Sequence, residues 1–202
     1  MKTNYFTSRN TMKTMFITAI IFLAITHVKA QTIYKTSPGP TESIKVLGTS
    51  NVHDWTMTST GVTSRGSFKF EGGHLAALRD FSLSVDVKTL KSDHSSMDNR
   101  TYKTINADQY PKIIYKLNSA IVTLVSKNKY LIKTTGDLTI AGATQIITME
   151  VTALVDIDNS ITCTGTEKIK LTDYKITPPT FMLGAMKVYN DLDIQFNLVY
   201  KN

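Results

Sequence analysis

The segment QIITMEVTALV, residues 145–155, alternates apolar and polar side chains over almost its whole length. From Ile147 onward every second residue is apolar, while Thr148, Glu150 and Thr152 occupy positions between them. Successive side chains of an extended chain point to opposite faces. The segment is therefore predicted to be a β-strand with one buried face and one solvated face.

The same period of two extends through most of the chain, as far as its last segment. In residues 188–200, Leu192, Ile194, Phe196 and Leu198 alternate with polar residues. Short turn-like stretches separate the alternating segments, as they do in antiparallel sheets. The segments predicted to be strands are Ser43–Thr49, Asp54–Ser59, Thr63–Phe70, Asp80–Val87, Lys112–Leu117, Ile121–Leu124, Lys129–Thr135, Leu138–Ile140, Gln145–Val155, Ile161–Leu171 and Val188–Tyr200.

One stretch lacks this alternation and is predicted to form a short helix near residues 96–108. Ser95 and Asp98 have the spacing of a helix-start motif in which both side chains bind free backbone amides. Pro111 follows Tyr110, and a residue before proline avoids the helical conformation. We therefore expect the helix to end before this pair.

Eight or more antiparallel strands with short connections and one helix are typical of a β-sandwich or a closed barrel. Long uncovered strand edges promote aggregation, which favours the closed form. An eight-stranded barrel encloses a space that side chains fill or that one slender ligand occupies. The sequence thus predicts an all-β antiparallel barrel of about eight strands. Because its inward positions are apolar, any ligand inside it should also be apolar.

Residues 1–30 have the features of a secretory signal peptide. Basic residues precede an uncharged apolar stretch over residues 14–26, and residues 28–30 provide a site for signal peptidase. A membrane-spanning helix needs about twenty apolar residues, which is more than this stretch offers. A short uncleaved anchor is the alternative. We expect cleavage near Ala30 and a single domain, residues 31–202, that is periplasmic or secreted.

The net charge of +7 comes largely from the predicted signal peptide. Residues 31–202 retain 19 basic residues and all 16 acidic ones, which leaves a net charge of +3. Nucleic-acid binding requires basic residues concentrated on one face and is therefore not expected. Cys163 is the one cysteine of the sequence, so no intrachain disulfide can form. We predict that Cys163 is a small buried hydrophobe rather than a reactive thiol.

Residues 51–55, NVHDW, hold the densest cluster of chemically capable side chains. Adjacent side chains on a strand point to opposite faces, so His53 and Asp54 are not expected to form a catalytic pair. The sequence contains no nucleophile motif of the Gly-x-Ser-x-Gly type. Trp55 suits a barrel mouth, where one edge of its ring stays wet. Neither an enzyme activity nor a cofactor is expected.

Three histidines leave another class of function open. His53, His74 and His94 are potential metal ligands, although their spacings match no local ligand motif. No metal site is predicted from them, but a metal-handling or stress-response protein remains an alternative. The apolar segment at residues 181–186 follows two prolines and is expected either to cover the barrel mouth as a lid or to plug it.

Three motifs resemble the YceI-like family. They are residues 51–55, residues 107–113 (ADQYPKI) and residues 136–144 (GDLTIAGAT), and the resemblance covers roughly residues 40–200. It implies an extended, lipocalin-like antiparallel barrel in the bacterial periplasm that binds a polyisoprenoid chain, as in isoprenoid quinones, along a hydrophobic tunnel. It also implies no conserved catalytic apparatus. Ala141 stands where family members often carry histidine, so that polar contact is not expected here.

The leading hypothesis is a periplasmic binding or carrier protein for an isoprenoid lipid, either a polyisoprenoid or an isoprenoid quinone. The expected partners are this lipid and at most a transient contact with a membrane. A ligand-free interaction module, with a barrel filled by side chains, is the other alternative. The residues expected to line the tunnel alternate along four strands, with Trp55 at the mouth: Phe81, Leu83, Val85, Ile113, Tyr115, Ile147, Met149, Val151, Leu192, Ile194, Phe196 and Leu198.

Overall fold

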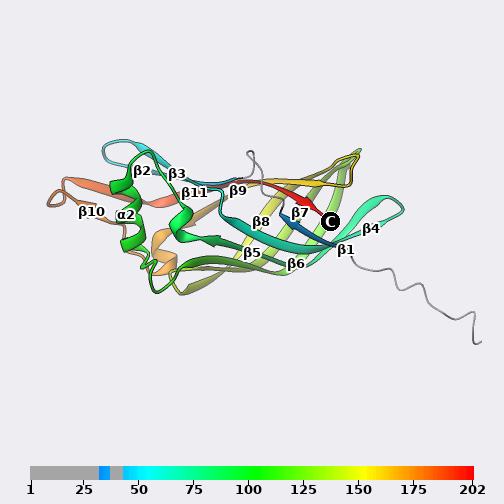
Figure 1. Ribbon diagram of the computed structural model, residues 1–202, viewed down its shortest axis with the longest axis horizontal. Helices are drawn as coiled ribbons and strands as arrows, with labels where there is room; N and C mark the ends of the chain where they lie inside the picture. Colours follow the sequence, from blue (N-terminus) through cyan, green and yellow to red (C-terminus); the bar gives the residue numbers. More distant parts are fainter. Residues whose placement is uncertain (1–31, 37–42) are drawn as a thin grey trace, which may run out of the picture. The chain divides into compact units, whose positions relative to one another are not determined.

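The computed structural model describes residues 32–36 and 43–202, so the predicted signal peptide and its cleavage site lie outside the described residues. Within these ranges, no helix has the length and hydropathy that crossing a membrane requires. Antiparallel strands dominate, together with short helices (Figure 1). The strands are β1 (Thr32–Thr36), β2 (Ser43–Ser50), β3 (Asp54–Ser59), β4 (Val62–Glu71), β5 (His74–Asp86), β6 (Lys112–Ser126), β7 (Lys129–Ile140), β8 (Ala143–Val155), β9 (Ile161–Lys170), β10 (Thr180–Phe181) and β11 (Met186–Lys201). The helices are η1 (Val87–Thr89), α2 (Ser95–Thr104) and η2 (Leu171–Tyr174).

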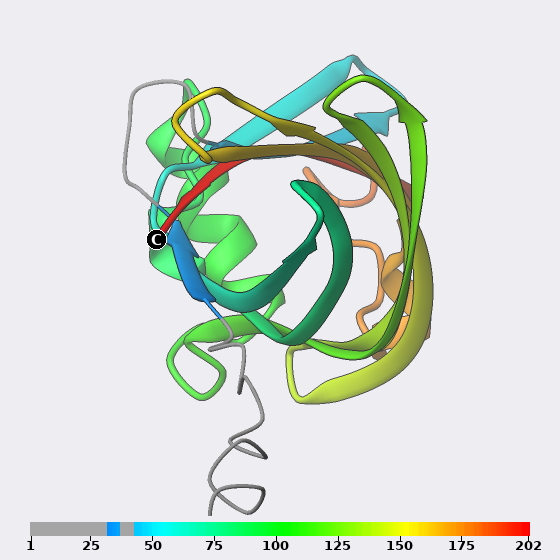
Figure 2. The ribbon, with the colours of Figure 1, turned by 90° about the vertical axis from the view of Figure 1, so that its right-hand side faces the viewer.

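Strands of the described ranges close into a ring in the order β1-β4-β5-β6-β7-β8-β9-β11 (Figure 2). The strand β1 completes the ring because it pairs with β4 on one side and with the C-terminal end of β11 on the other, where Thr36 lies opposite Tyr200. The predicted fold class, an all-β antiparallel barrel of about eight strands with one short helix, is confirmed. The strand β1 itself was not predicted.

The long strand β11 carries the sheet beyond this ring. One side of β11 pairs with β9, while residues 188–197 on its other side pair with β2, which in turn pairs with β3. Figure 1 shows β2, β3, β10 and α2 gathered at one end of the sheet. A bridge between Thr58 of β3 and Lys91 ties β3 to the segment that precedes α2. This end of the barrel is thus built from several short elements rather than from the ring alone.

Two pairs of predicted segments are single strands in the structure. The strand β6 covers both segments predicted between residues 112 and 124, and β7 covers both predicted between 129 and 140. The strand β5 is irregular: Asp80 has a φ of 50°, and the register of β5 with β4 shifts beside it. Because a bulge inserts an extra residue, Leu78 and Phe81 both face inward although they are three residues apart.

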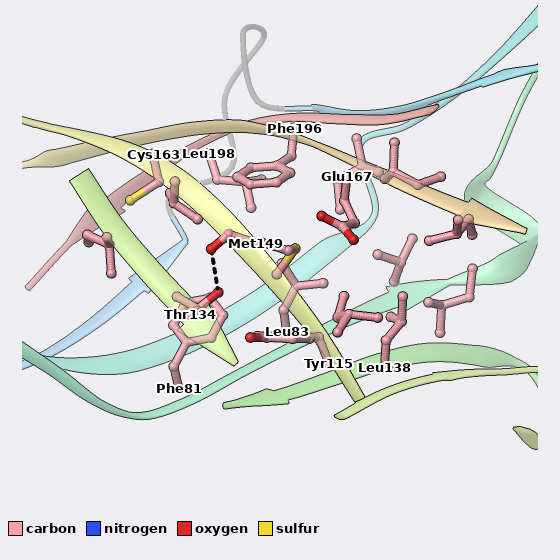
Figure 3. A pocket seen from close by; sticks show the side chains of 18 of the residues that line it. Phe81, Leu83, Tyr115, Thr134, Leu138, Met149, Cys163, Glu167, Phe196 and Leu198 are labelled. Atoms are coloured by element: carbon pink, nitrogen blue, oxygen red, sulfur yellow. Dashed lines mark hydrogen bonds between the residues drawn. The ribbon is translucent and has the colours of Figure 1, made fainter. Parts of the chain in front are cut away.

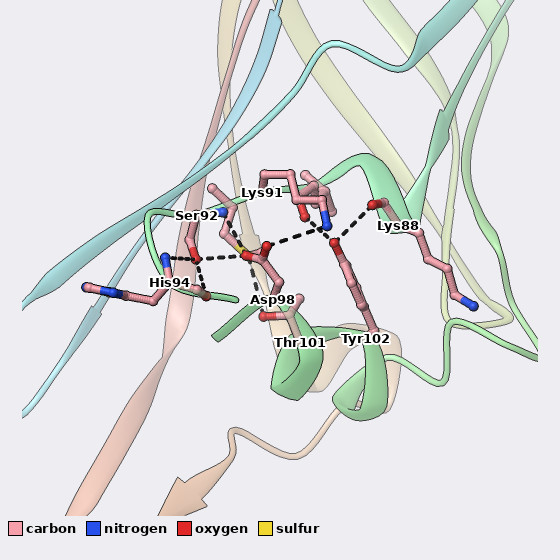
Figure 4. Close-up of polar contacts among 9 residues, drawn as sticks. Lys88, Lys91, Ser92, His94, Asp98, Thr101 and Tyr102 are labelled. Carbon is pink, nitrogen blue, oxygen red and sulfur yellow. Dashed lines mark hydrogen bonds and ion pairs between the residues drawn. The ribbon is translucent and has the colours of Figure 1, made fainter. Parts of the chain in front are cut away.

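The helix α2 differs from the prediction at both ends, since it spans Ser95–Thr104. Its N-cap is His94, whose side chain makes no capping hydrogen bond, so the predicted capping motif is wrong. Asp98 instead accepts hydrogen bonds from the backbone N–H and the hydroxyl of Ser92, both at 2.8 Å, and lies 3.6 Å from the Lys91 ammonium (Figure 4). The carboxylate therefore anchors the helix to the preceding segment rather than capping the helix.

The interior holds two clusters of buried side chains. In the first, the Tyr34 ring lies 5.3 Å from that of Phe68, and the Phe68 ring lies 5.5 Å from that of Tyr200. The second cluster draws on η1, η2 and the end of the α2 segment, and includes Val87 and Tyr174. Side chains from both clusters line one cavity, which therefore lies between them.

Candidate functional site

An apolar cavity of about 140 Å³ lies inside the ring. Apolar cavities of this size stay dry and take up a benzene-sized molecule. Its wall combines side chains from eight strands with one from the segment after η1, and Figure 3 shows most of them. They are Ile44, Val46, Phe68, Leu78, Phe81, Leu83, Val85, Leu90, Ile113, Tyr115, Ile132, Thr134, Leu138, Ile140, Ile147, Met149, Val151, Cys163, Glu167, Ile169, Ile194, Phe196, Leu198 and Tyr200.

Eleven of the thirteen side chains predicted to contact a ligand lie in the wall of this cavity. They come from β5, β6, β8 and β11, the four strands on which the alternation placed them. That they bind a ligand remains a prediction. The eleven are Phe81, Leu83, Val85, Ile113, Tyr115, Ile147, Met149, Val151, Ile194, Phe196 and Leu198.

The other two, Leu192 and Trp55, do not line the cavity. Leu192 has the inward parity of its strand but packs into the second core cluster, beyond the end of the cavity. Trp55 lies opposite Gly48 on β2, with its ring over the space that a Cβ would fill. The ring borders a second pocket beside α2, and its indole N–H is buried without a partner among the described residues. Alternation predicts a face, but not how far along the barrel a cavity reaches.

The parts of the wall formed by β2, β4, β7 and β9 were missed, although the signal of β9 is in the sequence. From Ile161 the inward positions of this strand continue through Cys163 to Glu167 and Ile169. The same alternation that identified the wall residues of β5, β6, β8 and β11 would have identified those of β9. The predicted burial of Cys163 is confirmed, and burial raises the pKa of its thiol to about 12, which suppresses its reactivity.

Few polar groups reach this cavity. Burial raises the pKa of the Glu167 carboxyl. Burial also raises the pKa of Tyr115, and the nearby charge of Glu167 adds to that rise. The Thr134 hydroxyl donates to the backbone carbonyl of Met149 at 3.4 Å (Figure 3), whereas the Tyr115 hydroxyl is buried with no partner at hydrogen-bonding geometry in the described part of the chain. This arrangement suits the burial of an apolar molecule.

The three candidate metal ligands do not meet. His53 and His94 both border the second pocket, beside α2. His74 lies at the turn between β4 and β5, where its Nδ1 is 3.4 Å from the Tyr130 hydroxyl. Across residues 32–36 and 43–202, no three His, Cys, Asp or Glu side chains come together as a potential metal site. The three histidines therefore share no common site.

The apolar segment at residues 181–186 forms the turn between β10 and β11. Leu183 at its tip is fully exposed, and Met182 is 72% exposed. Phe181 packs beneath the Arg100 guanidinium, 4.6 Å from its ring centroid, and borders the second pocket. None of these residues lines the cavity, and whether the segment acts as a lid or a plug stays a prediction.

A known protein family matches most of this chain. The model of the YceI-like domain matches residues 40–200. The chain belongs to the YceI-like family. The match runs from just before β2 almost to the end of β11, so the resemblance predicted from three short motifs is confirmed over nearly the whole barrel. No curated protein matches the sequence.

Solved structures similar to this YceI-like protein share its fold at low sequence identity. A polyisoprenoid binding domain from Saccharophagus degradans, implicated in plant cell wall breakdown, is 12% identical with a TM-score of 0.64, and the match covers 85% of this chain and 99% of that one. BcnA of Burkholderia cenocepacia is 17% identical with a TM-score of 0.62, over 78% and 95% of the chains. The Campylobacter jejuni YceI protein is 18% identical with a TM-score of 0.52, over 69% and 81%.

Proposed function

We propose that this YceI-like protein is a periplasmic carrier that binds an isoprenoid lipid, a polyisoprenoid or an isoprenoid quinone, inside its barrel. The observation that carries the proposal is a closed ring of strands around a cavity whose wall is apolar on nearly every side. The ligand class is supported by the similar Saccharophagus degradans domain, which is described as polyisoprenoid-binding. The features of residues 1–30 support export.

Burial of apolar surface provides the binding energy. Each methylene removed from water contributes about 0.8 kcal/mol, so one five-carbon isoprene unit gains several kcal/mol before the cost of ordering is counted. No hydrogen bond or catalytic group is needed for this gain, and the wall supplies aliphatic and aromatic side chains throughout. Such a wall favours the binding of an apolar molecule over catalysis.

The size of the cavity sets how a longer chain is held. A cavity of about 140 Å³ accommodates the equivalent of about one isoprene unit. Met149 and Phe196 lie in the wall, and a methionine side chain has three rotatable bonds with which to change its shape. We expect a longer polyisoprenoid to displace such side chains and to extend out of the cavity.

Extraction of the purified protein tests the proposal directly. Residues 31–202 form a compact unit and are the part to express, with export to the periplasm of a bacterial host. Organic-solvent extraction followed by mass spectrometry should recover a prenyl lipid in near-stoichiometric amount. Protein that carries no prenyl lipid, and that takes up none when incubated with a C10 to C20 prenol series, would contradict the proposal.

Charge placed in the wall should abolish ligand retention. Val151→Glu or Ile194→Glu puts a carboxylate into the apolar cavity, where ionisation is costly. We expect lipid recovery to fall at least tenfold while the variants are still exported. The matched control is Gln195→Glu, which adds the same charge to an exposed position on the same strand and should leave recovery unchanged.

Fractionation of cells that express the full chain tests the location. The proposed carrier should be released with the periplasmic fraction, and its intact mass should correspond to a chain that begins near Gln31. Recovery in the cytoplasm at full length would overturn the periplasmic assignment while leaving lipid binding open to the extraction experiment.

A further inference from the structure

Glu167 introduces an ionisable carboxyl into an otherwise apolar wall. It belongs to β9 and lies opposite Ile194 on β11, with Ile169 as its inward neighbour along the strand. The ladder between β8 and β9 ends at the pair Val151–Gly165, so no β8 residue is paired with Glu167. Figure 3 shows its carboxylate pointing among the apolar side chains of the cavity.

The Glu167 carboxylate lacks a protein partner. In the described part of the chain, no group donates a hydrogen bond to it and no cation forms an ion pair with it, and burial raises its pKa. The Tyr115 hydroxyl, which also lines the cavity, is buried with no partner at hydrogen-bonding geometry in the same ranges. Tyr115 and Glu167 both line the cavity, and the charge of Glu167 adds to the rise that burial gives the pKa of Tyr115.

Glu167 is partly buried, and a partly buried carboxylate without a protein partner is stabilised when a ligand donates a hydrogen bond to it. A hydroxyl on a bound lipid would donate to the Glu167 carboxylate and accept from a tyrosine hydroxyl, so it matches both needs. A phosphate in the same position would bring a second negative charge close to the carboxylate, where the low dielectric strengthens repulsion. The same carboxylate therefore favours a hydroxyl head group and disfavours a phosphate head group.

We propose that Glu167, with the hydroxyl of Tyr115, forms a polar subsite of the cavity that selects uncharged lipid alcohols over lipid phosphates with the same chain. The inference rests on the proposed lipid-binding function and specifies its ligand class. The subsite selects the head group of the lipid, whereas the apolar wall binds the lipid tail.

Three ligands that share one C10 chain test the subsite: geraniol, geranyl methyl ether and geranyl phosphate. Dissociation constants are measured at pH 8 by displacement of a fluorescent apolar probe. For the unmodified protein we expect geraniol to bind at least tenfold more tightly than geranyl phosphate. We also expect it to bind several-fold more tightly than the ether, which has no hydroxyl to donate.

Substitutions at Glu167 separate the two effects. Glu167→Gln keeps an acceptor oxygen but removes the charge, so it should strengthen geranyl phosphate binding at least fivefold and leave geraniol little changed. Glu167→Leu removes the acceptor as well and should abolish the preference for geraniol over the ether. The control is Glu150→Gln on β8, an exposed carboxyl that should alter none of the three constants.

The failures of the two proposals are distinguishable. Binding of all three ligands with the same relative affinities in the unmodified protein and in Glu167→Gln would overturn the subsite while leaving the lipid-binding function intact. Failure of every ligand to displace the probe from the unmodified protein would overturn the lipid-binding function, and the subsite with it.

Discussion

At the scale of single residues, Glu167 couples the cavity to pH. Burial raises the pKa of its carboxyl above the ordinary value of 4.5, so the folded chain holds this proton more tightly than the unfolded chain does. The stability associated with Glu167 is therefore fully present below pH 4.5. It is lost as pH rises through the higher pKa of the folded state, because ionisation is then easier in the unfolded chain.

Glu167→Gln should remove this dependence. We expect the variant to be more stable than the unmodified protein at pH 8, and the difference to shrink as pH falls toward 4.5. Urea denaturation of both proteins at several pH values from 4 to 8 measures the difference. A stability difference that is the same at every pH would contradict the assignment, and Glu150→Gln on the exposed face serves as the control.

At the scale of elements, α2 is held in place by polar contacts rather than by a large apolar face. The Tyr102 hydroxyl lies 2.9 Å and 2.7 Å from the carbonyl oxygens of Lys88 and Leu90 (Figure 4). Burial acts to raise the pKa of Asp98, but the hydrogen bonds from Ser92 and the charge of Lys91 outweigh it and hold the pKa below 3.8. These contacts fix the helix to the segment between η1 and α2.

Asp98→Asn should therefore destabilise the protein by about 1 kcal/mol at pH 7, because the asparagine keeps an acceptor oxygen but loses the charge that strengthens the two hydrogen bonds from Ser92 and attracts Lys91. The stabilising effect of a lowered pKa is present above pH 3.8 and disappears as pH falls through the folded value. The difference between the two proteins should accordingly narrow in strong acid. Chemical denaturation from pH 7 to pH 3 measures it, and Asp93→Asn, at an exposed neighbouring position, should have little effect.

The strand β7 depends on a close approach at Gly136. A Cβ there would meet the backbone oxygen of Lys116 on β6 and the ring of Tyr115. Gly136→Ala should cost about 1–3 kcal/mol, since an overpacked site must shift backbone or displace the ring. Thermal denaturation measures this loss. Lys133→Ala, at an exposed position of the same strand, should change stability by less than about 0.5 kcal/mol.

Alternation predicted the strands well because burial on one face demands it, and this held even for the long strands β8 and β11. The alternation pattern failed where backbone geometry, rather than side-chain polarity, determines which residues form a strand or face inward. The bulge near Asp80 breaks the alternation within β5, so the predicted segment began only at Asp80 and Leu78 was missed, and the short strand β1 offers too few residues to show a period. Glu167 was missed as a wall residue for another reason. A carboxyl side chain is usually assumed to face solvent, although the alternation along β9 places Glu167 on the inward face.

At the scale of the whole molecule, the ring is completed by the five residues of β1. Tyr34 at its centre is 2% exposed and packs edge-on against Phe68, whereas its neighbour Ile33 is 59% exposed. The closure of the barrel and the packing of its first core cluster thus depend on the same short strand.

Tyr34→Ala should destabilise the barrel by about 3–4 kcal/mol, as expected for the removal of a large buried aromatic side chain. Ile33→Ala, in the same strand but exposed, should cost far less. Urea denaturation of both variants measures the difference. Similar losses in the two proteins would show that β1 contributes through its backbone alone.

The pairing of Thr36 with Tyr200 also determines when the barrel can close during folding. A chain that leaves the ribosome or crosses a membrane from its N-terminus cannot close this barrel until Tyr200 has emerged. Contacts between such distant parts of a sequence form slowly. During that delay β1 and β9, the two strands that pair with β11 to close the ring, each present an edge to which another chain can add. Refolding at high concentration should therefore yield aggregates in place of barrels, and dilution should restore the yield.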